Sequence, residues 1–215
     1  MKRISVIFLV FFFNASYAQL VIKPKLGLSL AKMKRPEPGT FDPEFHTVNK
    51  AGFLFGVAGE YSLNSKISLQ IEILYVQKGL KDTSHIPTGF TTGGYYKGYR
   101  YDLNYIDFPV LFRYAPYPNF NIGAGPFISI LTNGEYHLDN KKKDVDIAWS
   151  RVDYGYNIDI SFAVKKIELG SRYVHGINPV KYEIAFDPER GGPLKGEIGE
   201  NRGFHFYVSY RINTN

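Results

Sequence analysis

The residues of this sequence best suited to acid–base or metal chemistry are its histidines, which are scattered as His46, His85, His137, His175 and His205. A catalytic set needs a nucleophile, a base and an orienting group within reach of one another. The sequence has no Gly-x-Ser-x-Gly, His-Glu-x-x-His or phosphate-binding glycine motif to supply one. Cysteine is absent, which excludes disulfides, thiolate metal sites and cysteine nucleophiles. We therefore expect a non-enzymatic protein with no catalytic residues, no cofactor and no metal site.

Four other groups could bind something, and each has a simpler interpretation. Asp82 and His85 lack an evident third metal ligand, and His205 fits a hydrogen-bonded interior position. The basic run 141–144 lies in a mixed-charge stretch, so we expect a solvated loop with at most weak contact to lipid phosphates. Nucleic acid would need basic residues spread along a face with stacking aromatics, despite the net charge of +6. The aromatic segment 95–101 indicates two strands that extend past a membrane, or else a rim that contacts a ligand or protein.

Most other charged residues follow a regular pattern, because they alternate with large apolar residues. From Arg151 to Val164, valine, tyrosine, isoleucine or phenylalanine occupies every second position, and polar or small residues lie between them. Such a period of two indicates a β-strand with one apolar face. The alternation recurs over residues 22–31, 53–63, 67–77, 105–114, 120–130, 151–164, 167–173 and 204–212. The sequence therefore predicts eight strands of about ten residues, the length that a tilted strand needs to cross a bilayer.

The connections between these strands alternate between short and long. Three are tight turns, at 64–66, 116–118 and 165–166. Four are long and polar, over roughly 32–51, 79–102, 132–150 and 178–201. In outer-membrane barrels the termini and short turns lie in the periplasm, and the long loops face outward. We predict an all-β fold, an eight-stranded antiparallel up-and-down transmembrane β-barrel with that orientation.

A soluble lipocalin-type barrel is the alternative, since it alternates in the same way with its apolar face inward. The apolar face, however, carries too many large residues for the narrow interior of an eight-stranded barrel. The other face is rich in glycine, alanine, serine and charges, which suits a polar lumen. Tyrosines of the apolar face also lie near strand ends, as at membrane interfaces. We predict an aromatic girdle of Tyr61, Tyr114 and Tyr210 at the short-turn side and of Tyr75, Tyr154 and Tyr173 at the long-loop side.

The N-terminus has the three regions of a secretory signal peptide. A basic start, Met1–Arg3, precedes the apolar run Ile4–Phe13, and small residues stand three and one positions before a cut after Ala18. As a helix, this run spans about 15 Å, half of a hydrocarbon core, so it is too short for a membrane anchor. We predict a signal peptide at 1–18, cleavage after Ala18, and a barrel domain at 19–215 in the cell outer membrane.

Charged residues with the parity of the polar face should point into the barrel. The bases are Lys23, Lys25, Lys78, Arg113, Arg151, Arg172 and Arg211, and the acids are Glu60, Glu72, Asp107, Asp153, Asp159 and Glu168. A nearly balanced set of long side chains should fill so narrow a lumen and close it by ion pairs. If 165–166 is a two-residue turn, Asp159 and Arg172 lie directly opposite each other, about 5 Å apart at their Cβ atoms.

Several of these strands also resemble those of a known family. Residues 69–79, 103–112, 123–127 and 170–177 are similar, in this order, to strand motifs of the PorT-like outer-membrane β-barrel family, and the resemblance covers residues 20–212. It implies a small porin-like barrel. The member that gives the family its name is linked to type IX protein secretion.

From these observations we expect a non-enzymatic structural or adaptor protein of the bacterial envelope. Its partners would be outer-membrane lipid and an envelope or secretion-system protein, with no nucleic acid. A small porin that passes solutes is the alternative, followed by an enzyme with its site at the outer rim of the barrel. The biological task, the partner and the oligomeric state do not follow from the sequence.

Overall fold

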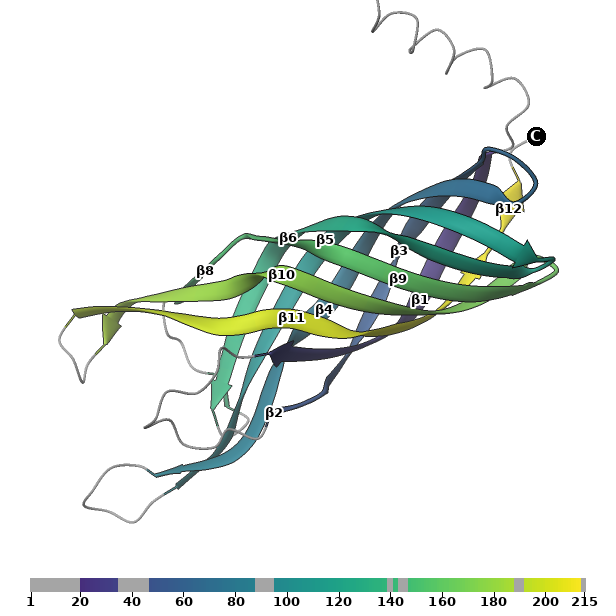
Figure 1. The fold of residues 1–215 in the computed structure, drawn as a ribbon. Helices are drawn as coiled ribbons and strands as arrows, with labels where there is room; N and C mark the ends of the chain where they lie inside the picture. Colours follow the sequence, from purple (N-terminus) through teal and green to yellow (C-terminus); the bar gives the residue numbers. More distant parts are fainter. Residues whose placement is uncertain are drawn as a thin grey trace, which may run out of the picture.

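The protein forms a barrel of long antiparallel strands (Figure 1). The structure is a computed structural model that describes residues 20–34, 47–87, 95–138, 141–142, 147–187 and 192–213. The wall consists of β1 (Leu20–Lys34), β3 (Lys50–Ser62), β4 (Ile67–Pro87), β5 (Tyr95–Tyr117), β6 (Phe120–Leu138), β9 (Val152–Val164), β10 (Ile167–Asp187) and β11 (Gly192–Tyr210). Short strands β2 (Thr47–Val48), β7 (Lys141–Lys142), β8 (Ile147–Trp149) and β12 (Ile212–Asn213) pair with β4, β6, β10 and β1.

Each long strand pairs with the next one along the chain, and β11 pairs with β1 to close the sheet. The closing ladder runs from Lys25 opposite Ser209 to Lys34 opposite Glu200. A closed sheet leaves no strand edge, so the long strands have a hydrogen-bonded neighbour on both sides. The predicted eight-stranded antiparallel up-and-down barrel is thereby confirmed. None of the described residues forms a helix long and apolar enough to span a membrane.

Tight turns join the strands at one end of the barrel. Between β3 and β4, the Asn64 side chain accepts hydrogen bonds from the backbone of Lys66 and Ile67, both at 2.8 Å. The turn between β9 and β10 consists of 165–166, as predicted. The turn between β5 and β6 is shifted from the predicted 116–118, because β5 continues to Tyr117. Asn119 there adopts a positive φ of 70°, which asparagine tolerates better than most residues.

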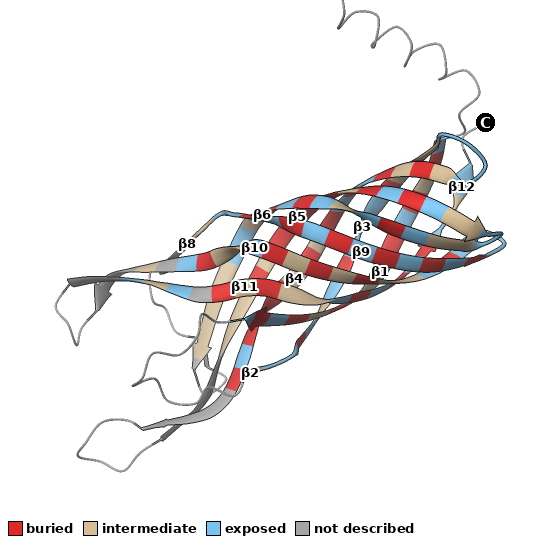
Figure 2. Cartoon of the chain, in the orientation of Figure 1, coloured by how far each residue is buried: buried red, intermediate tan, exposed pale blue. Residues whose placement is uncertain are grey.

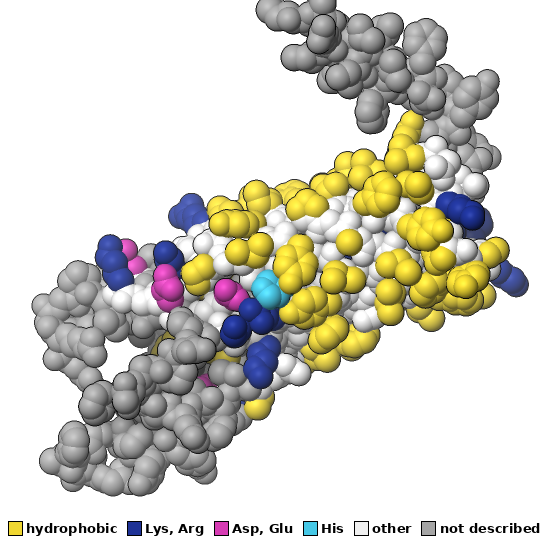
Figure 3. All heavy atoms as spheres, in the orientation of Figure 1, with side chains coloured by type: hydrophobic (Ala, Val, Ile, Leu, Met, Phe, Trp, Pro, Cys, Tyr) yellow, Lys and Arg dark blue, Asp and Glu magenta, His cyan; other side chains and the backbone are white. Residues whose placement is uncertain are grey.

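Burial alternates along the strands, and the apolar residues face outward. β9 alternates without interruption between exposed and buried residues over its whole length (Figure 2). Leu26 and Leu28 are 59% and 60% exposed, whereas Lys23 and Asp159 are fully buried. We call the outward-facing apolar side chains of the long strands the apolar belt; Figure 3 shows its side chains in yellow on one face of the barrel. This inside-out distribution is that of a barrel surrounded by lipid.

Much of what the sequence suggested as long loops is strand. β4, β5, β6, β10 and β11 continue past the apolar belt as paired extensions, some of which project at the left of Figure 1. The expected extension over 95–101 is confirmed for the backbone. The apolar alternation ends where the outer face meets water, although the backbone hydrogen bonds continue. The signal peptide, His46 and residues 143–144 lie outside the described residues.

Candidate functional site: the lumen of the barrel

The candidate site is the interior of the barrel, where charged side chains from all around the wall meet. Most members of the predicted lumen set are buried there: Lys23, Lys25, Glu60, Glu72, Lys78, Asp107, Arg113, Asp153, Asp159, Glu168 and Arg172. The side chains of two others lie elsewhere. Arg151 is exposed and precedes β9, so the prediction that it joins the network is wrong. Arg211 is half-buried between β11 and β12 and lines the mouth of the barrel at the turn end.

The first cluster lies next to the tight turns and is centred on Arg113. One nitrogen of its guanidinium, Nη1, lies 2.8 Å from a Glu60 oxygen, and the other, Nη2, lies 3.0 Å from a Glu168 oxygen. Lys23 pairs with the same two carboxylates, and its Nζ is 3.0 Å from Glu168. The Ser68 hydroxyl donates a 2.6 Å hydrogen bond to Glu60. Two bases thus compensate two acids, and buried charges require such compensation.

The second cluster lies deeper and is centred on Arg172. Its Nη1 and Nη2 donate a paired set of hydrogen bonds to Glu72, at 2.7 and 2.8 Å, and its Nε donates to Asp159 at 3.0 Å. Asp159 lies directly opposite Arg172 in the ladder, so the register prediction from the turn is confirmed. Lys25 adds a 2.6 Å bond to Glu72, and its Nζ lies 3.8 Å from the ring centre of Tyr207. The paired geometry of arginine and carboxylate is the strong form of such contacts.

Two uncharged side chains hold the clusters together, and sequence reasoning missed both. The Gln70 carbonyl oxygen accepts hydrogen bonds from Lys23 at 2.9 Å and Arg113 at 2.7 Å, and its amide donates to Glu72. Gln70 therefore joins the first cluster to the second. The Tyr207 hydroxyl donates to both oxygens of Asp159, at 2.9 and 3.0 Å. Their lumen parity was visible in the sequence, but a charge count ignores neutral hydrogen-bonding groups.

The third cluster contains Lys78. Its Nζ lies 3.0 Å from Asp107, 3.0 Å from the Ser129 hydroxyl and 3.9 Å from Asp153. Asn201 donates a 3.0 Å hydrogen bond to Asp153. One base therefore faces two acids here, and one oxygen of each acid has no hydrogen-bond partner among the described residues. This is the least compensated part of the network.

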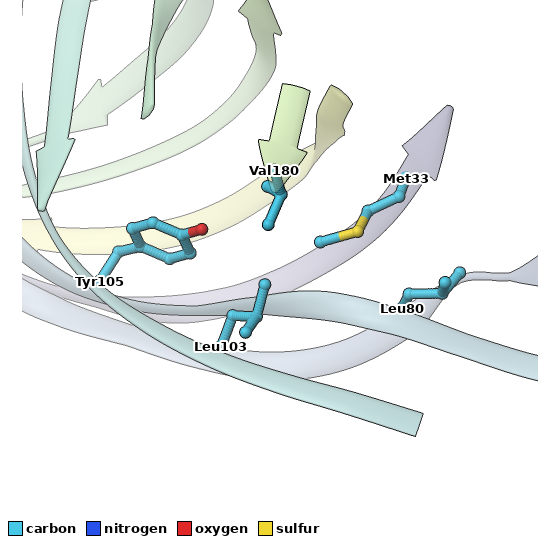
Figure 4. Packing of buried hydrophobic residues seen from close by; sticks show 5 residues of the cluster. All are labelled: Met33, Leu80, Leu103, Tyr105 and Val180. Carbon is cyan, nitrogen blue, oxygen red and sulfur yellow. The ribbon is translucent and has the colours of Figure 1, made fainter. Parts of the chain in front are cut away.

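An apolar cluster fills the lumen beyond Lys78, toward the strand extensions. It consists of Met33, Leu80, Leu103, Tyr105 and Val180, all at most 1% exposed, whose side chains converge from different strands (Figure 4). Partly buried Tyr101, Leu131, Tyr136 and Trp149 pack against it. This apolar cap was not predicted from the sequence. Its members have lumen parity, but inward positions were expected to be polar.

At the other end, the mouth beside the turns is a pocket of about 410 Å³. Glu60 and Ser68, both members of the first cluster, line this pocket together with the turn residues. The interior thus has charged clusters from the turn-side mouth inward and an apolar cap toward the extensions. Side chains that bond to one another fill it, and none of its described groups is arranged as a nucleophile with a base.

The described histidines do not meet in the lumen. His205 is buried opposite Arg172, but its Nδ1 has no hydrogen-bond partner in the described part of the chain, unlike the expected hydrogen-bonded histidine. The His137 Nε2 lies 3.2 Å from Asp102 on the strand extensions. His175 faces outward on β10. The side chain of His85 lies outside the described residues.

The predicted girdle tyrosines all face outward. Tyr61, Tyr114 and Tyr210 lie near the tight turns, opposite Leu69, Ile122 and Ile167 respectively. Tyr75, Tyr154 and Tyr173 lie toward the strand extensions, opposite Phe55, Ile128 and Phe204. Tyrosines near both ends of an apolar belt are typical of a membrane barrel, because their rings combine an apolar body with a polar tip.

Comparisons with known proteins agree with this architecture. The chain belongs to the outer membrane protein beta-barrel domain family, whose model matches residues 14–182. The fold is similar to that of the outer membrane protein OprG from Pseudomonas aeruginosa, with 8% identity, a TM-score of 0.57, and coverage of 92% of this chain and 97% of that one. A major outer membrane protein from Thermus thermophilus is also similar, with 8% identity, a TM-score of 0.50, and coverage of 91% and 100%. No curated protein matches the sequence. Family membership indicates an outer-membrane location.

Proposed function

We propose that the protein is a non-enzymatic structural or adaptor barrel of the outer membrane and that its lumen does not pass solutes. The observation that carries this proposal is the filled interior. Arg113 and Arg172, at 0% and 2% exposed, each bridge two carboxylates across the lumen. A solute path would have to break these contacts and also displace the apolar cap, leaving buried charges uncompensated.

The strand extensions support the adaptor role. Beyond the apolar belt, β4 and β5 remain paired as far as Pro87 opposite Tyr95, and β10 and β11 as far as Asp187 opposite Gly192. Paired strands present a more rigid surface than irregular loops, and rigid scaffolds position binding residues better. The resemblance to PorT-like barrels adds a link to protein secretion. We propose an envelope or secretion-system protein as the partner that these extensions contact.

Conductance across planar bilayers tests the closed lumen. Wild-type protein should show no steady channel, whereas a variant with Arg113→Ala and Arg172→Ala should become leaky, because it loses the side chains that bridge the lumen. Lys181→Gln with Lys195→Gln is the control, since these exposed lysines lie on the extensions outside the lumen. A stable, large conductance of the wild type would contradict the proposal and favour a small porin.

Crosslinking in intact outer membranes, followed by purification, tests the adaptor role. Wild-type protein should retain a defined envelope protein that is lost when the tip of the β4–β5 extension is shortened. The tight turn at 64–66 offers a control position at the other end of the barrel. Loss of the partner from a variant altered only at this turn would place the contact on the periplasmic side instead.

A further inference from the structure

A row of nitrogen-bearing side chains faces outward where the apolar belt ends on β1 and β11, next to His175 on β10. In the belt, Leu30 lies opposite Phe204, which in turn lies opposite Tyr173. Two residues farther along the same three strands, Lys32 lies opposite Arg202, which lies opposite His175. Two residues of strand correspond to about 7 Å. Lys32 and Arg202 therefore lie one step past the last apolar residue of their strands, at the depth of lipid headgroups, and His175 lies beside them.

The charges in this row are not balanced by the protein. Lys32 and Arg202 are like charges directly across a strand pair, an arrangement that destabilises a sheet. Lys34, which is also exposed and outward-facing, lies one step farther out and directly opposite Glu200. The one carboxylate facing them among the described residues of β1, β10 and β11 is Glu200, 2.7 Å from Arg202 Nη2. That hydrogen bond and the Arg202 charge hold the pKa of Glu200 below its usual value, so it stays ionised at neutral pH.

Arg202 is held in place by Glu200, but not all of its N–H groups have a hydrogen-bond partner among the described residues. Its Nε is buried and has no hydrogen-bond partner among the described residues, while its side chain as a whole stays 29% exposed. Beside it, His175 stacks on Tyr156, with ring centres 4.9 Å apart, and its Nδ1 lies 3.1 Å from the Tyr173 hydroxyl. Tyr156 and Tyr173 thus fix the position of the imidazole. The result is a preorganised surface of hydrogen-bond donors with surplus positive charge.

We propose that Lys32, Lys34 and Arg202, with His175 beside them, form a binding site for the phosphate group of a membrane lipid. With the strand extensions on the cell exterior, this is a lipid of the outer leaflet. A phosphate between Lys32 and Arg202 relieves their mutual repulsion and accepts hydrogen bonds from both. In Figure 3, basic side chains gather where the yellow belt ends. The orientation rests on the proposed function, but the lipid contact does not depend on a closed lumen.

Three other cations on the extensions each have an acid close by. The Arg100 Nε lies 3.0 Å from Asp102, Lys181 lies 3.3 Å from Glu197, and Lys195 lies 3.1 Å from Glu183. Each is therefore neutralised by a nearby acid. Lys181 and Lys195 also lie several residues farther from the apolar belt, beyond the depth of a phosphate. Lys32, Lys34 and Arg202, in contrast, share the single carboxylate of Glu200.

Native mass spectrometry of the protein in neutral detergent, titrated with diphosphoryl lipid A, tests this site. We expect bound lipid on the wild type. Lys32→Gln with Arg202→Gln should weaken binding about 25-fold, since each cation near an anionic surface contributes about fivefold. Lys181→Gln with Lys195→Gln removes the same charge from strand positions farther out and should leave binding unchanged. A heat-dependent shift in electrophoretic mobility verifies that each variant is folded.

Two further measurements identify the source of the phosphate. Inorganic phosphate at millimolar concentration should not displace the lipid, because the belt residues beside the site also hold its acyl chains. The wild type should bind lipid A that lacks phosphates only weakly. Its affinity for this lipid should match the affinity of the Lys32→Gln/Arg202→Gln variant for intact lipid A. Equal lipid binding by both double variants, or displacement by inorganic phosphate alone, would overturn the proposal.

Discussion

Arg172 is the cation that compensates two buried carboxylates of the second cluster, Glu72 and Asp159. In the Arg172→Ala variant, Glu72 keeps Lys25 and Asp159 keeps the Tyr207 hydroxyl, but both carboxylates lose a buried cation. Breaking buried pairs in this way costs about 3–5 kcal/mol. We expect a loss of this order in the free energy of unfolding, measured by urea titration in lipid vesicles.

The combined variant Arg172→Ala with Asp159→Ala separates charge compensation from simple loss of packing. It removes one of the two carboxylates that lose their cation. Its loss in free energy of unfolding should therefore be smaller than the sum of the losses in the two single variants. Arg100→Ala is the control, because its pair with Asp102 is partly exposed and should be worth at most about 1 kcal/mol. Strictly additive effects of the two lumen substitutions would count against a coupled network.

Gly170 lies at a position of the wall that has no room for a side chain. It lies opposite Tyr207, and a Cβ at this position would come within 2.2 Å of the tyrosine ring. Gly170→Ala should therefore push the Tyr207 hydroxyl away from Asp159 and destabilise the barrel by about 1–3 kcal/mol, the usual cost of overpacking. Gly59→Ala is a matched control, since the nearest atom to its Cβ would be 4.0 Å away. Equal unfolding midpoints of the two variants would show that the ring moves freely.

The charged residues of the lumen could be predicted from the sequence, whereas the neutral residues that bond to them could not. Parity alone places Lys23, Glu72 and Asp159 inside, because a strand in lipid allows charges on one face only. Arg151 breaks this rule because β9 begins one residue later, at Val152, so the parity of the strand does not apply to Arg151. Gln70 and Tyr207 have the right parity but no charge. Only the side-chain geometry shows that Gln70 connects two clusters and that Tyr207 supports Asp159 within the second.

At the scale of elements, the short strand β8 brings Trp149 against the apolar cap. Trp149 is the protein's only tryptophan, and its ring lies 5.2 Å from that of Tyr101, edge to face. Its fluorescence should therefore report on the cap. We expect emission at shorter wavelength than in urea, with a shift to longer wavelength and stronger acrylamide quenching in Leu103→Ala. The same emission in Leu103→Ala and the wild type would mean that Trp149 does not depend on the cap.

The strands inside the apolar belt were predictable, and those beyond it were not. Between Val152 and Val164 lipid on one side and a polar lumen on the other impose the period of two on the sequence. Beyond Lys78, β4 faces water on the outside and points apolar residues of its own, such as Leu80, inward, so the pattern is lost although pairing with β5 continues. The cap was missed for the same reason, because its leucines occupy positions expected to be polar.

At the scale of the whole molecule, closure of the sheet should give a barrel that resists detergent. Every long strand has a partner on both sides, so separating any two of them breaks a full ladder of backbone hydrogen bonds. We expect the unheated protein to migrate differently from the boiled protein in SDS electrophoresis. Its circular dichroism spectrum should be that of a β-sheet. Identical mobility before and after boiling, together with a helical spectrum, would contradict the closed barrel.

The pairing of β1 with β11 also sets an order of events for assembly. Lys25 has its partner at Ser209, so the seam joins β1 to β11, the last of the long wall strands in chain order. Until β11 arrives, β1 exposes a row of unpaired backbone groups that can template pairing with other chains. Contacts so distant in sequence also form slowly. The chain must therefore remain unfolded and shielded until its C-terminal strand is available, and a chain that lacks this strand is left with two open edges.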